Sequence, residues 1–180
     1  MASGFWAGCA AARRAREVPP DGLDETEIAA AWEAALAPLR RERGPDPVEI
    51  LRRLQRLVVD PEVNFFRSGP GLAAAQARVE EIWQDAGRAR ALDGHRLAQC
   101  HEVRHAALTA HAMFAAAQAR QETRGWHRRL DFPQRDDARW RRWTLAQPTL
   151  PPGGLGWTLT TLEYEDQKVF QPCPLGGEAS

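Results

Sequence analysis

The chain of 180 residues contains little lysine, little cysteine and no long apolar run. Lys168 is its only lysine, so nearly all positive charge is arginine, which suits bidentate pairing with carboxylates and also fits a compositional bias of the coding sequence. Cys9, Cys100 and Cys173 are odd in number and form no C-x-x-C pair, which argues against a zinc knuckle or disulfide framework. This cysteine usage favours the cytoplasm, a reducing compartment. No apolar stretch approaches the length of a membrane span, so direct membrane insertion is not expected.

Two further absences restrict the function. No G-x-G-x-x-G follows a strand pattern, so the sequence offers no βαβ helix N-terminus to receive the pyrophosphate of a dinucleotide. The formal net charge is zero, which gives no electrostatic reason to expect nucleic acid or an anionic membrane as partner. The length and the 43% hydrophobic content instead predict a modest globular protein with a real core.

The apolar residues recur with helical spacing in three segments. They predict helices from Pro47 to about residue 60, from the loop at 67–70 to about residue 93, and from about His95 to Arg124. Short turns between such helices favour an antiparallel arrangement. Two earlier helices are expected at 3–17 and from Asp24 to about Arg43, the second kinked or ended early by Pro38. The expected fold is mostly α, a three-helix antiparallel bundle with a short C-terminal β-ribbon.

The tail beyond Gly153 has a period of two. Trp157, Leu159 and Thr161 alternate with their neighbours, which is typical of a strand. Residues 165–167 are expected to form a turn, and 168–170 to form the second strand of the ribbon. Because an isolated two-stranded ribbon is marginally stable, it should pack on the bundle or on a partner.

The most distinctive segment runs from Arg120 to Asp137 and is called the signature segment below. Gly125 is expected to adopt the left-handed conformation and end the preceding helix, and Pro133 should keep the residue before it extended. The alternating charges admit two interpretations, a solvated salt-bridged loop or a clamp against a neighbouring domain, and both stay open on the residues alone.

The signature segment resembles the pattern R-x-E-S-R-G-x-H-x-R-x-D-x-P-x-R-D-D of the succinate dehydrogenase and fumarate reductase flavoproteins and the related L-aspartate oxidases and adenylylsulfate reductases. Thr123 replaces the usual Ser, and Trp126 replaces a small residue. The flanking E-V-R-H helix and the T-L-E-Y tail resemble the same family. The matching positions are Arg120, Glu122, Arg124, Gly125, His127, Arg129, Asp131, Pro133, Arg135, Asp136 and Asp137.

The resemblance implies a division of the chain and a function. Residues 1–18 would be a remnant of the last helix of a flavin-binding domain, 19–46 a helical linker, and 47–180 the C-terminal helical domain with an extended tail. The complete protein would be an FAD-dependent oxidoreductase. This chain would bind no cofactor alone and supply no catalytic residue, and its partners would be a flavin-binding domain or chain and an iron-sulfur subunit. The resemblance also suggests that Ser3 and Gly4 lie near the flavin when that domain is present.

A different class of function stays open, namely a stand-alone helical interaction module without redox activity. An exposed apolar face around Trp6, Trp126 and Phe132 would favour the flavoenzyme, since an absent partner leaves its contact surface bare. A polar, closed surface there would favour the module.

One motif points to zinc but fits poorly. His101-Glu102-Val103-Arg104-His105 matches H-E-x-x-H, in which two histidines on one helical face bind zinc and the glutamate acts as base. Arg104 would place a permanent cation beside the metal. Glu122, as third ligand, would sit roughly 25 Å away along a straight helix at about 1.5 Å per residue. No metal site is therefore expected.

Overall fold

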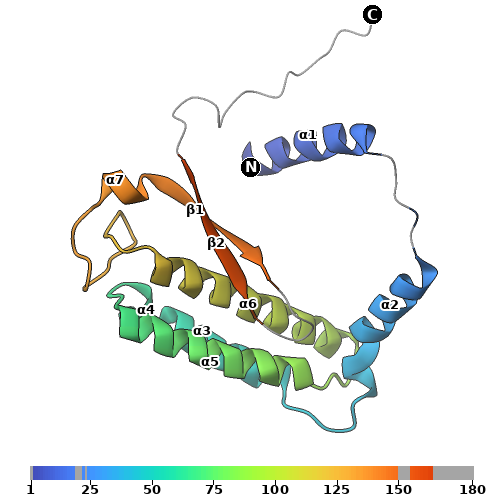
Figure 1. Cartoon of the computed structure of the whole chain (residues 1–180). Coiled ribbons are helices and arrows are strands. Elements are labelled where there is room, and N and C mark those ends of the chain that lie inside the picture. Colours follow the sequence, from blue (N-terminus) through green and yellow to red (C-terminus); the bar gives the residue numbers. More distant parts are fainter. Residues whose placement is uncertain (1, 19–21, 23, 150–154, 164–180) are drawn as a thin grey trace, which may run out of the picture. The chain divides into compact units, whose positions relative to one another are not determined.

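A computed structural model describes residues 2–18, 22, 24–149 and 155–163 of the chain. The chain divides into two compact units, which are described separately. The first comprises Met1–Trp32 with Glu165–Ser180, and the second comprises Glu33–Tyr164. Figure 1 labels the helices and strands.

Helix α1 spans Ala2–Glu17 and belongs to the first unit. Helix α2 spans Glu25–Arg40, and the Asp24 carboxylate caps its start by accepting a hydrogen bond from the Thr26 N–H at 2.7 Å. Helix α2 continues through Pro38 and ends two residues later, before the expected end near Arg43. Pro38 lies in the last turn and is buried.

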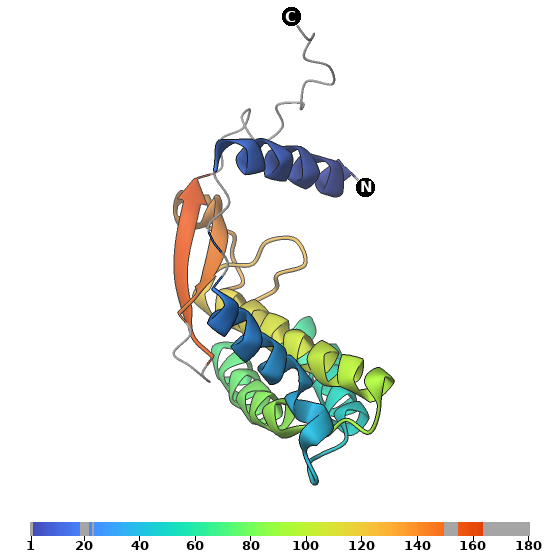
Figure 2. The same cartoon turned by 90° about the vertical axis from the view of Figure 1, so that its right-hand side faces the viewer.

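The second unit is built on three long helices, α3 (Pro47–Val59), α5 (Gly69–Arg88) and α6 (Gly94–Ala119), with the single turn α4 (Pro61–Asn64) between α3 and α5. An Asp or Ser side chain caps the start of each, and a proline opens α3, α4 and α5 within the first two positions. Short connections make each long helix antiparallel to the one before it, as Figures 1 and 2 show. The predicted three-helix antiparallel bundle is confirmed.

The core lies where the three long helices face one another. The helically spaced apolar residues of α3 and α5 face this core: Leu54 and Val79 are buried, while Leu51, Val58 and Trp83 are partly buried against it. Helix α6 contributes three alanines, which let its neighbours approach closely, together with Cys100, Val103 and Phe114. Met113 of the same helix is 37% exposed. The buried apolar cluster comprises Ile50, Leu54, Leu57, Val63, Leu72, Ala75, Val79, Ile82, Ala86, Ala89, Ala91, Cys100, Val103, Ala107, Ala110, Phe114 and Ala117.

The last long helix ends earlier than the sequence predicted. Helix α6 stops at Ala119, and the Arg120 backbone is already extended, with φ −77° and ψ 104°. The expectation that this helix reaches Arg124 and ends at Gly125 is therefore wrong. The physical reason is that an arginine side chain, described below, caps the C-terminal carbonyls in place of a left-handed glycine.

The β-ribbon consists of β1 (Arg142–Pro148) and β2 (Trp157–Glu163), which pair antiparallel with Arg142 opposite Glu163. The single turn α7 (Asp137–Trp140) precedes β1. The strand expected at 157–162 is confirmed, but its partner is β1, which precedes it in the chain; the expected partner at 168–170 lies outside the described residues. The ribbon packs on α6, and the indole Nε1 of Trp157 donates a hydrogen bond to Nδ1 of buried His111 at 2.8 Å.

Among the described residues, none of the helices combines the length and the apolar character that a bilayer crossing requires.

Candidate functional site

The signature segment folds over the end of the bundle where α6 ends and α5 begins. Its first feature is a two-residue hairpin turn in which Arg124 and His127 exchange backbone hydrogen bonds of 2.8 and 3.0 Å. Gly125 occupies the first central position with φ +56°. The predicted left-handed glycine is thus confirmed, but it serves a turn whose first central residue requires positive φ, and not a helix exit.

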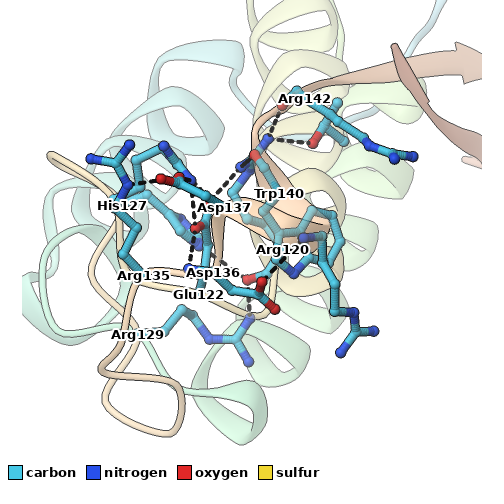
Figure 3. Close-up of polar contacts among 12 residues, drawn as sticks. Arg120, Glu122, His127, Arg129, Arg135, Asp136, Asp137, Trp140 and Arg142 are labelled. Atoms are coloured by element: carbon cyan, nitrogen blue, oxygen red, sulfur yellow. Dashed lines mark hydrogen bonds and ion pairs between the residues drawn. The ribbon is translucent and has the colours of Figure 1, made fainter. Parts of the chain in front are cut away.

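Glu122 is the centre of a buried charge network, with its residue 0% exposed. The carboxylate accepts hydrogen bonds from Arg124 Nε at 2.7 Å and Nη2 at 3.0 Å, and from Arg120 Nη1 at 2.6 Å. The Asp136 N–H donates a fourth at 3.0 Å. Burial alone would raise the pKa of Glu122, but the hydrogen bonds from Arg124, the Asp136 backbone and Arg120 outweigh it and lower that pKa. Glu122 therefore stays ionised and holds the two arginines in place (Figure 3).

Arg120 connects the end of α6 to the ribbon. Its Nη1 also donates to the Trp140 carbonyl at 2.9 Å, and its Nη2 donates to the Arg142 carbonyl at 2.5 Å and to Thr144 Oγ1 at 3.2 Å. The guanidinium lies 5.3 Å from the centre of the Trp140 ring. One side chain thereby satisfies backbone carbonyls on both sides of the junction between α7 and β1.

Arg124 extends the network outward to Asp137, whose Oδ1 accepts from Arg124 Nη2 at 2.5 Å and from Arg135 Nε at 2.7 Å. These two arginines lower the pKa of Asp137 to about 2, Arg135 having the larger effect. The paired carboxylates in turn raise the pKa of Arg124 above its usual range. The charges of this segment are therefore mutually compensated, which rules out a simple solvated loop for Glu122 and Arg124.

Arg129 and Asp131 bridge the ends of two antiparallel helices. Arg129, 3% exposed, donates from Nη1 to the carbonyls of Ala117 and Gln118 at 2.9 and 3.0 Å, which places a cation at the negative end of α6. Asp131 accepts two hydrogen bonds from Arg129, both at 2.8 Å, and one from the Gly69 N–H at the start of α5, also at 2.8 Å. The anion therefore lies at the positive end of α5. The Arg129 hydrogen bonds hold the pKa of Asp131 well below its usual range.

His127 is half-buried and contacts arginines and carbonyls. Its Nε2 lies 3.1 Å from the Arg120 carbonyl and its Nδ1 lies 3.1 Å from Arg67 Nη1. Because a guanidinium only donates and a carbonyl only accepts, the neutral Nε2–H tautomer satisfies both contacts. Burial is the main cause that lowers the pKa of His127, and the charges of neighbouring arginines act in the same direction. The two hydrogen-bonding neighbours of His127 are thus Arg67 and a carbonyl, and neither is a carboxylate.

The rest of the signature segment is held by backbone contacts. Arg67 N donates to the Arg128 carbonyl at 3.2 Å, and Leu130 N donates to the Arg67 carbonyl at 2.8 Å. Thr123 Oγ1 accepts from the Arg129 N–H at 2.9 Å, a contact that the more usual serine hydroxyl would also make. Pro133 is exposed.

An apolar surface adjoins the network. We call it the aromatic rim, and it consists of Phe65, Phe66, Trp126 and Leu130, all exposed, with Trp126 at 83%. Phe65 and Trp126 meet edge to face, with ring centres 6.1 Å apart, and Arg128 lies 5.6 Å from the Phe66 ring. Of the three residues that distinguish the two functions, Trp126 is exposed and Phe132 is half-buried beneath Arg129. The side chain of Trp6 lies outside the described residues.

Sequence reasoning found most of the network but missed its partners from elsewhere in the chain. Arg67, Gly69 and Trp140 contact the signature segment across separations of up to 62 residues, and no local pattern marks them. Ser3 and Gly4 lie in the first turn of α1, in the unit that is described separately, so a flavin contact there stays a prediction.

The H-E-x-x-H residues do not form a set of metal ligands. His101 Nε2 lies 3.0 Å from the Ala35 carbonyl, and Glu122 forms ion pairs with Arg120 and Arg124. Within the part of the chain that the structure describes, no three His, Cys, Asp or Glu side chains form a group suited to a metal ion.

Comparison with known proteins identifies the same segment. Residues 52–172 match the model of a family described as fumarate reductase flavoprotein C-term. The succinate dehydrogenase flavoprotein subunit of Coxiella burnetii is 29% identical over 72% of this chain and 22% of that protein. The fumarate reductase flavoprotein subunit of Helicobacter pylori (strain 26695) is 27% identical over 74% of this chain and 19% of its own length. The chain thus spans about a fifth of these relatives. The L-aspartate oxidase of Rhodospirillum rubrum is 31% identical over 83% of this chain and 57% of that protein.

Solved structures share the fold. Adenylylsulfate reductase from Archaeoglobus fulgidus superposes with a TM-score of 0.72 at 21% identity, over 82% of this chain and 26% of that one. The Escherichia coli quinol fumarate reductase flavoprotein chain gives 0.70 at 22% identity, over 89% of this chain and 28% of that one.

Proposed function

Because this chain belongs to the family of fumarate reductase flavoprotein C-terminal domains, we propose that it works as the C-terminal domain of an FAD-dependent oxidoreductase of the succinate dehydrogenase and fumarate reductase type. Its role is structural, and the flavin chemistry belongs to a flavin-binding domain on the same or a separate polypeptide. The observation that carries this proposal is the family match over residues 52–172, which contains the whole bundle core beyond Leu51 and the signature segment.

The described residues do not hold FAD by themselves. Among them the one sheet is a two-stranded antiparallel ribbon, so there is no parallel strand followed by a helix whose N-terminus could receive the pyrophosphate. Arg120, Arg124 and Arg129 of the signature segment instead donate hydrogen bonds to carboxylates and carbonyls of this chain. In this proposal FAD is bound by the flavin domain, with Ser3 and Gly4 contributing only in its presence.

We assign the aromatic rim and the adjoining hairpin turn as the surface that meets the flavin domain. Contiguous exposed apolar side chains on a monomer are typical of an interface. In the rim, Trp126 contacts Phe65 edge to face, and the Leu130 N–H donates to the carbonyl of Arg67, the residue after Phe66. The charge network behind the rim holds the turn rigid, which reduces the entropy lost on docking. The alternative, a stand-alone interaction module, is favoured by a polar and closed surface, which this end of the bundle lacks. An iron-sulfur subunit as a further partner and a cytoplasmic location complete the proposal.

The test is to purify the tagged chain at its natural expression level from the organism that encodes it and to measure flavin per chain. We expect about one FAD per chain by visible absorbance and mass spectrometry, together with a polypeptide that carries G-x-G-x-x-G. Purification without flavin and without such a polypeptide would contradict the proposal and support the stand-alone module.

The rim assignment has its own matched pair of variants. Trp126→Ser should lower the flavin recovered per chain, because it removes the most exposed aromatic side chain of the rim. Leu92→Ser is the control, since Leu92 is 70% exposed but follows the far end of α5. Equal losses in both variants would overturn the rim assignment while leaving the family role intact.

A further inference from the structure

A buried histidine lies between the ribbon and the bundle, apart from the signature segment. His111 is on α6, and its residue is 4% exposed. Its Nδ1 accepts a hydrogen bond from the indole Nε1 of Trp157 at 2.8 Å. Its Nε2 lies 3.4 Å from Oε1 of Glu80 on α5. The ring is therefore held between β2 on one side and α5 on the other.

These two contacts specify the protonation state of His111. An indole N–H only donates, so Nδ1 must be unprotonated in order to accept the bond from Trp157. A carboxylate accepts, so the proton of the neutral ring lies on Nε2 and is directed at Glu80. The contact with Trp157 has the usual length of a hydrogen bond, and the contact with Glu80 is longer. The neutral Nε2–H tautomer therefore holds the ribbon more closely than it holds α5.

A second proton on the ring would reverse this preference. Both nitrogens of a charged histidine donate, so the Nδ1–H would face the Trp157 Nε1–H, and two donors cannot form a hydrogen bond. The charged ring would attract the Glu80 carboxylate in a charge-assisted hydrogen bond. The Glu80 side chain is 55% exposed, so it has room to move closer. Neutral His111 thus favours the ribbon, and charged His111 favours α5.

The charged groups on the surrounding elements leave this exchange to His111 and Glu80. Arg104, earlier on α6, lies over an aromatic ring of α5. Arg142 and Glu163 pair with each other at the end of the ribbon that is opposite to Trp157. Helix α3 meets α6 along a hollow whose described lining residues carry no charge. Among the described residues, Glu80 is the charged group recorded in contact with the His111 ring.

The two ends of the ribbon are attached to the bundle by different chemistry. At the end near Arg142, Arg120 donates hydrogen bonds to the Trp140 and Arg142 carbonyls. Arginine is not deprotonated in proteins, so this attachment does not respond to pH. At the other end, where β2 begins, the attachment includes the hydrogen bond from Trp157 to His111. Histidine is the side chain whose charge ordinarily changes between about pH 5 and 8.

We propose that His111 is a proton-operated latch for the ribbon. Neutral His111 binds Trp157, and the ribbon is attached at both ends. As the pH falls through the histidine range, His111 takes up a proton, releases Trp157 and pairs with Glu80. The hydrogen bond to the neutral ring is present on the alkaline side of this range and lost on the acid side, so acid detaches the Trp157 end while the Arg120 end stays attached. This latch does not depend on the flavin-domain assignment.

The test is NMR of the full chain between about pH 8 and about pH 5, the range in which histidine titrates. It follows the His111 ring signals and the hydrogen exchange of the Trp157 indole N–H, which Trp157→Phe assigns by its absence. We expect the protection of this N–H, relative to an exposed indole at the same pH, to fall about fivefold or more as His111 is protonated, the scale of one hydrogen bond. The core amides should stay protected, which separates release of the ribbon from unfolding. Protection that does not follow the titration of His111 would overturn the proposal.

Variants connect the release to the His111 ring. His111→Asn supplies an amide oxygen that can accept from Trp157 and does not titrate, so the protection of the indole N–H should become independent of pH. Glu80→Gln removes the anion that pairs with the charged ring and should move the release to lower pH. Glu81→Gln is the matched control, because Glu81 is the adjacent exposed glutamate of α5 and lines a hollow shared with α3. Release of His111→Asn at the same pH as the parent, or equal shifts in the two glutamate variants, would refute the latch.

Discussion

The bundle core and the buried charges of the signature segment are stabilised by different physical interactions. The core is apolar, and its energy depends mainly on the area removed from water, which is insensitive to direction. The signature segment buries Glu122 and Arg129, whose charges are tolerated only because each polar atom has a partner in the right direction. The comparison teaches that the core should accept a change of shape, whereas the signature segment should reject even an isosteric change of charge.

The largest expected effect comes from Glu122→Gln. The amide has nearly the shape of the carboxylate but leaves Arg120 and Arg124 without their shared anion, and breaking a buried pair costs about 3–5 kcal/mol. Urea unfolding of the variant and the parent would measure the loss in free energy of unfolding.

Two controls sharpen this prediction. Glu49→Gln breaks an exposed pair with Arg52 and should cost less than about 1 kcal/mol. Leu54→Met changes the shape of a core residue at similar volume and should cost less than about 1.5 kcal/mol. If either control destabilised the protein as much as Glu122→Gln, the contrast between the core and the signature segment would fail.

The second-largest effect is expected from Arg129→Lys. This change retains the positive charge but removes the planar guanidinium group, which makes two parallel hydrogen bonds. Lysine cannot bind Asp131 through two parallel hydrogen bonds while also donating to the Ala117 and Gln118 carbonyls. We expect a loss of about 2 kcal/mol, the scale of hydrogen bonds to charged groups. Thermal unfolding checks this, and a lysine variant as stable as the parent would show that charge alone caps α6.

Acid should destabilise the signature segment before it affects the core. Arg129 lowers the folded-state pKa of Asp131 below its unfolded value of about 4. The contribution of ionised Asp131 to the free energy of unfolding is therefore fully present above pH of about 4, and it is lost as the pH falls from there through the folded-state pKa. After allowance for partial exposure, we expect about 1–2 kcal/mol to be lost below pH of about 4. Asp131→Asn should flatten this part of the pH profile, and an unchanged slope would refute the assignment.

The smallest effect concerns the attachment of the ribbon. Trp157→Phe keeps most of the packing but removes the hydrogen bond to His111, which should cost about 1 kcal/mol. Trp126→Phe, at an 83% exposed position, should change stability by less than about 0.5 kcal/mol. Equal effects measured by thermal unfolding would show that the His111 contact does not hold the ribbon.

Local chemistry explains which features were predictable. The helical stripes of α3 and α5, their proline and side-chain caps, and the left-handed Gly125 depend on residues within a few positions of one another. The end of α6 was mispredicted because its cap, Arg129, lies ten residues beyond Ala119. The pairing of β2 with β1 was not predicted, because strand pairing depends on which segment the bundle holds nearby.

The sequence by itself determined the helical class, the bundle and the family, because periodicity and a dense motif are properties of neighbouring residues. Only the tertiary structure decided what the charges of the motif do. It placed Asp131 at the start of α5, Arg129 at the end of α6 and Glu122 between two arginines. Whether a carboxylate is solvated, paired or buried depends on groups brought together by folding, and the distance from Asp131 to Gly69 along the chain is 62 residues. Electrostatic complementarity of that kind exists only in three dimensions.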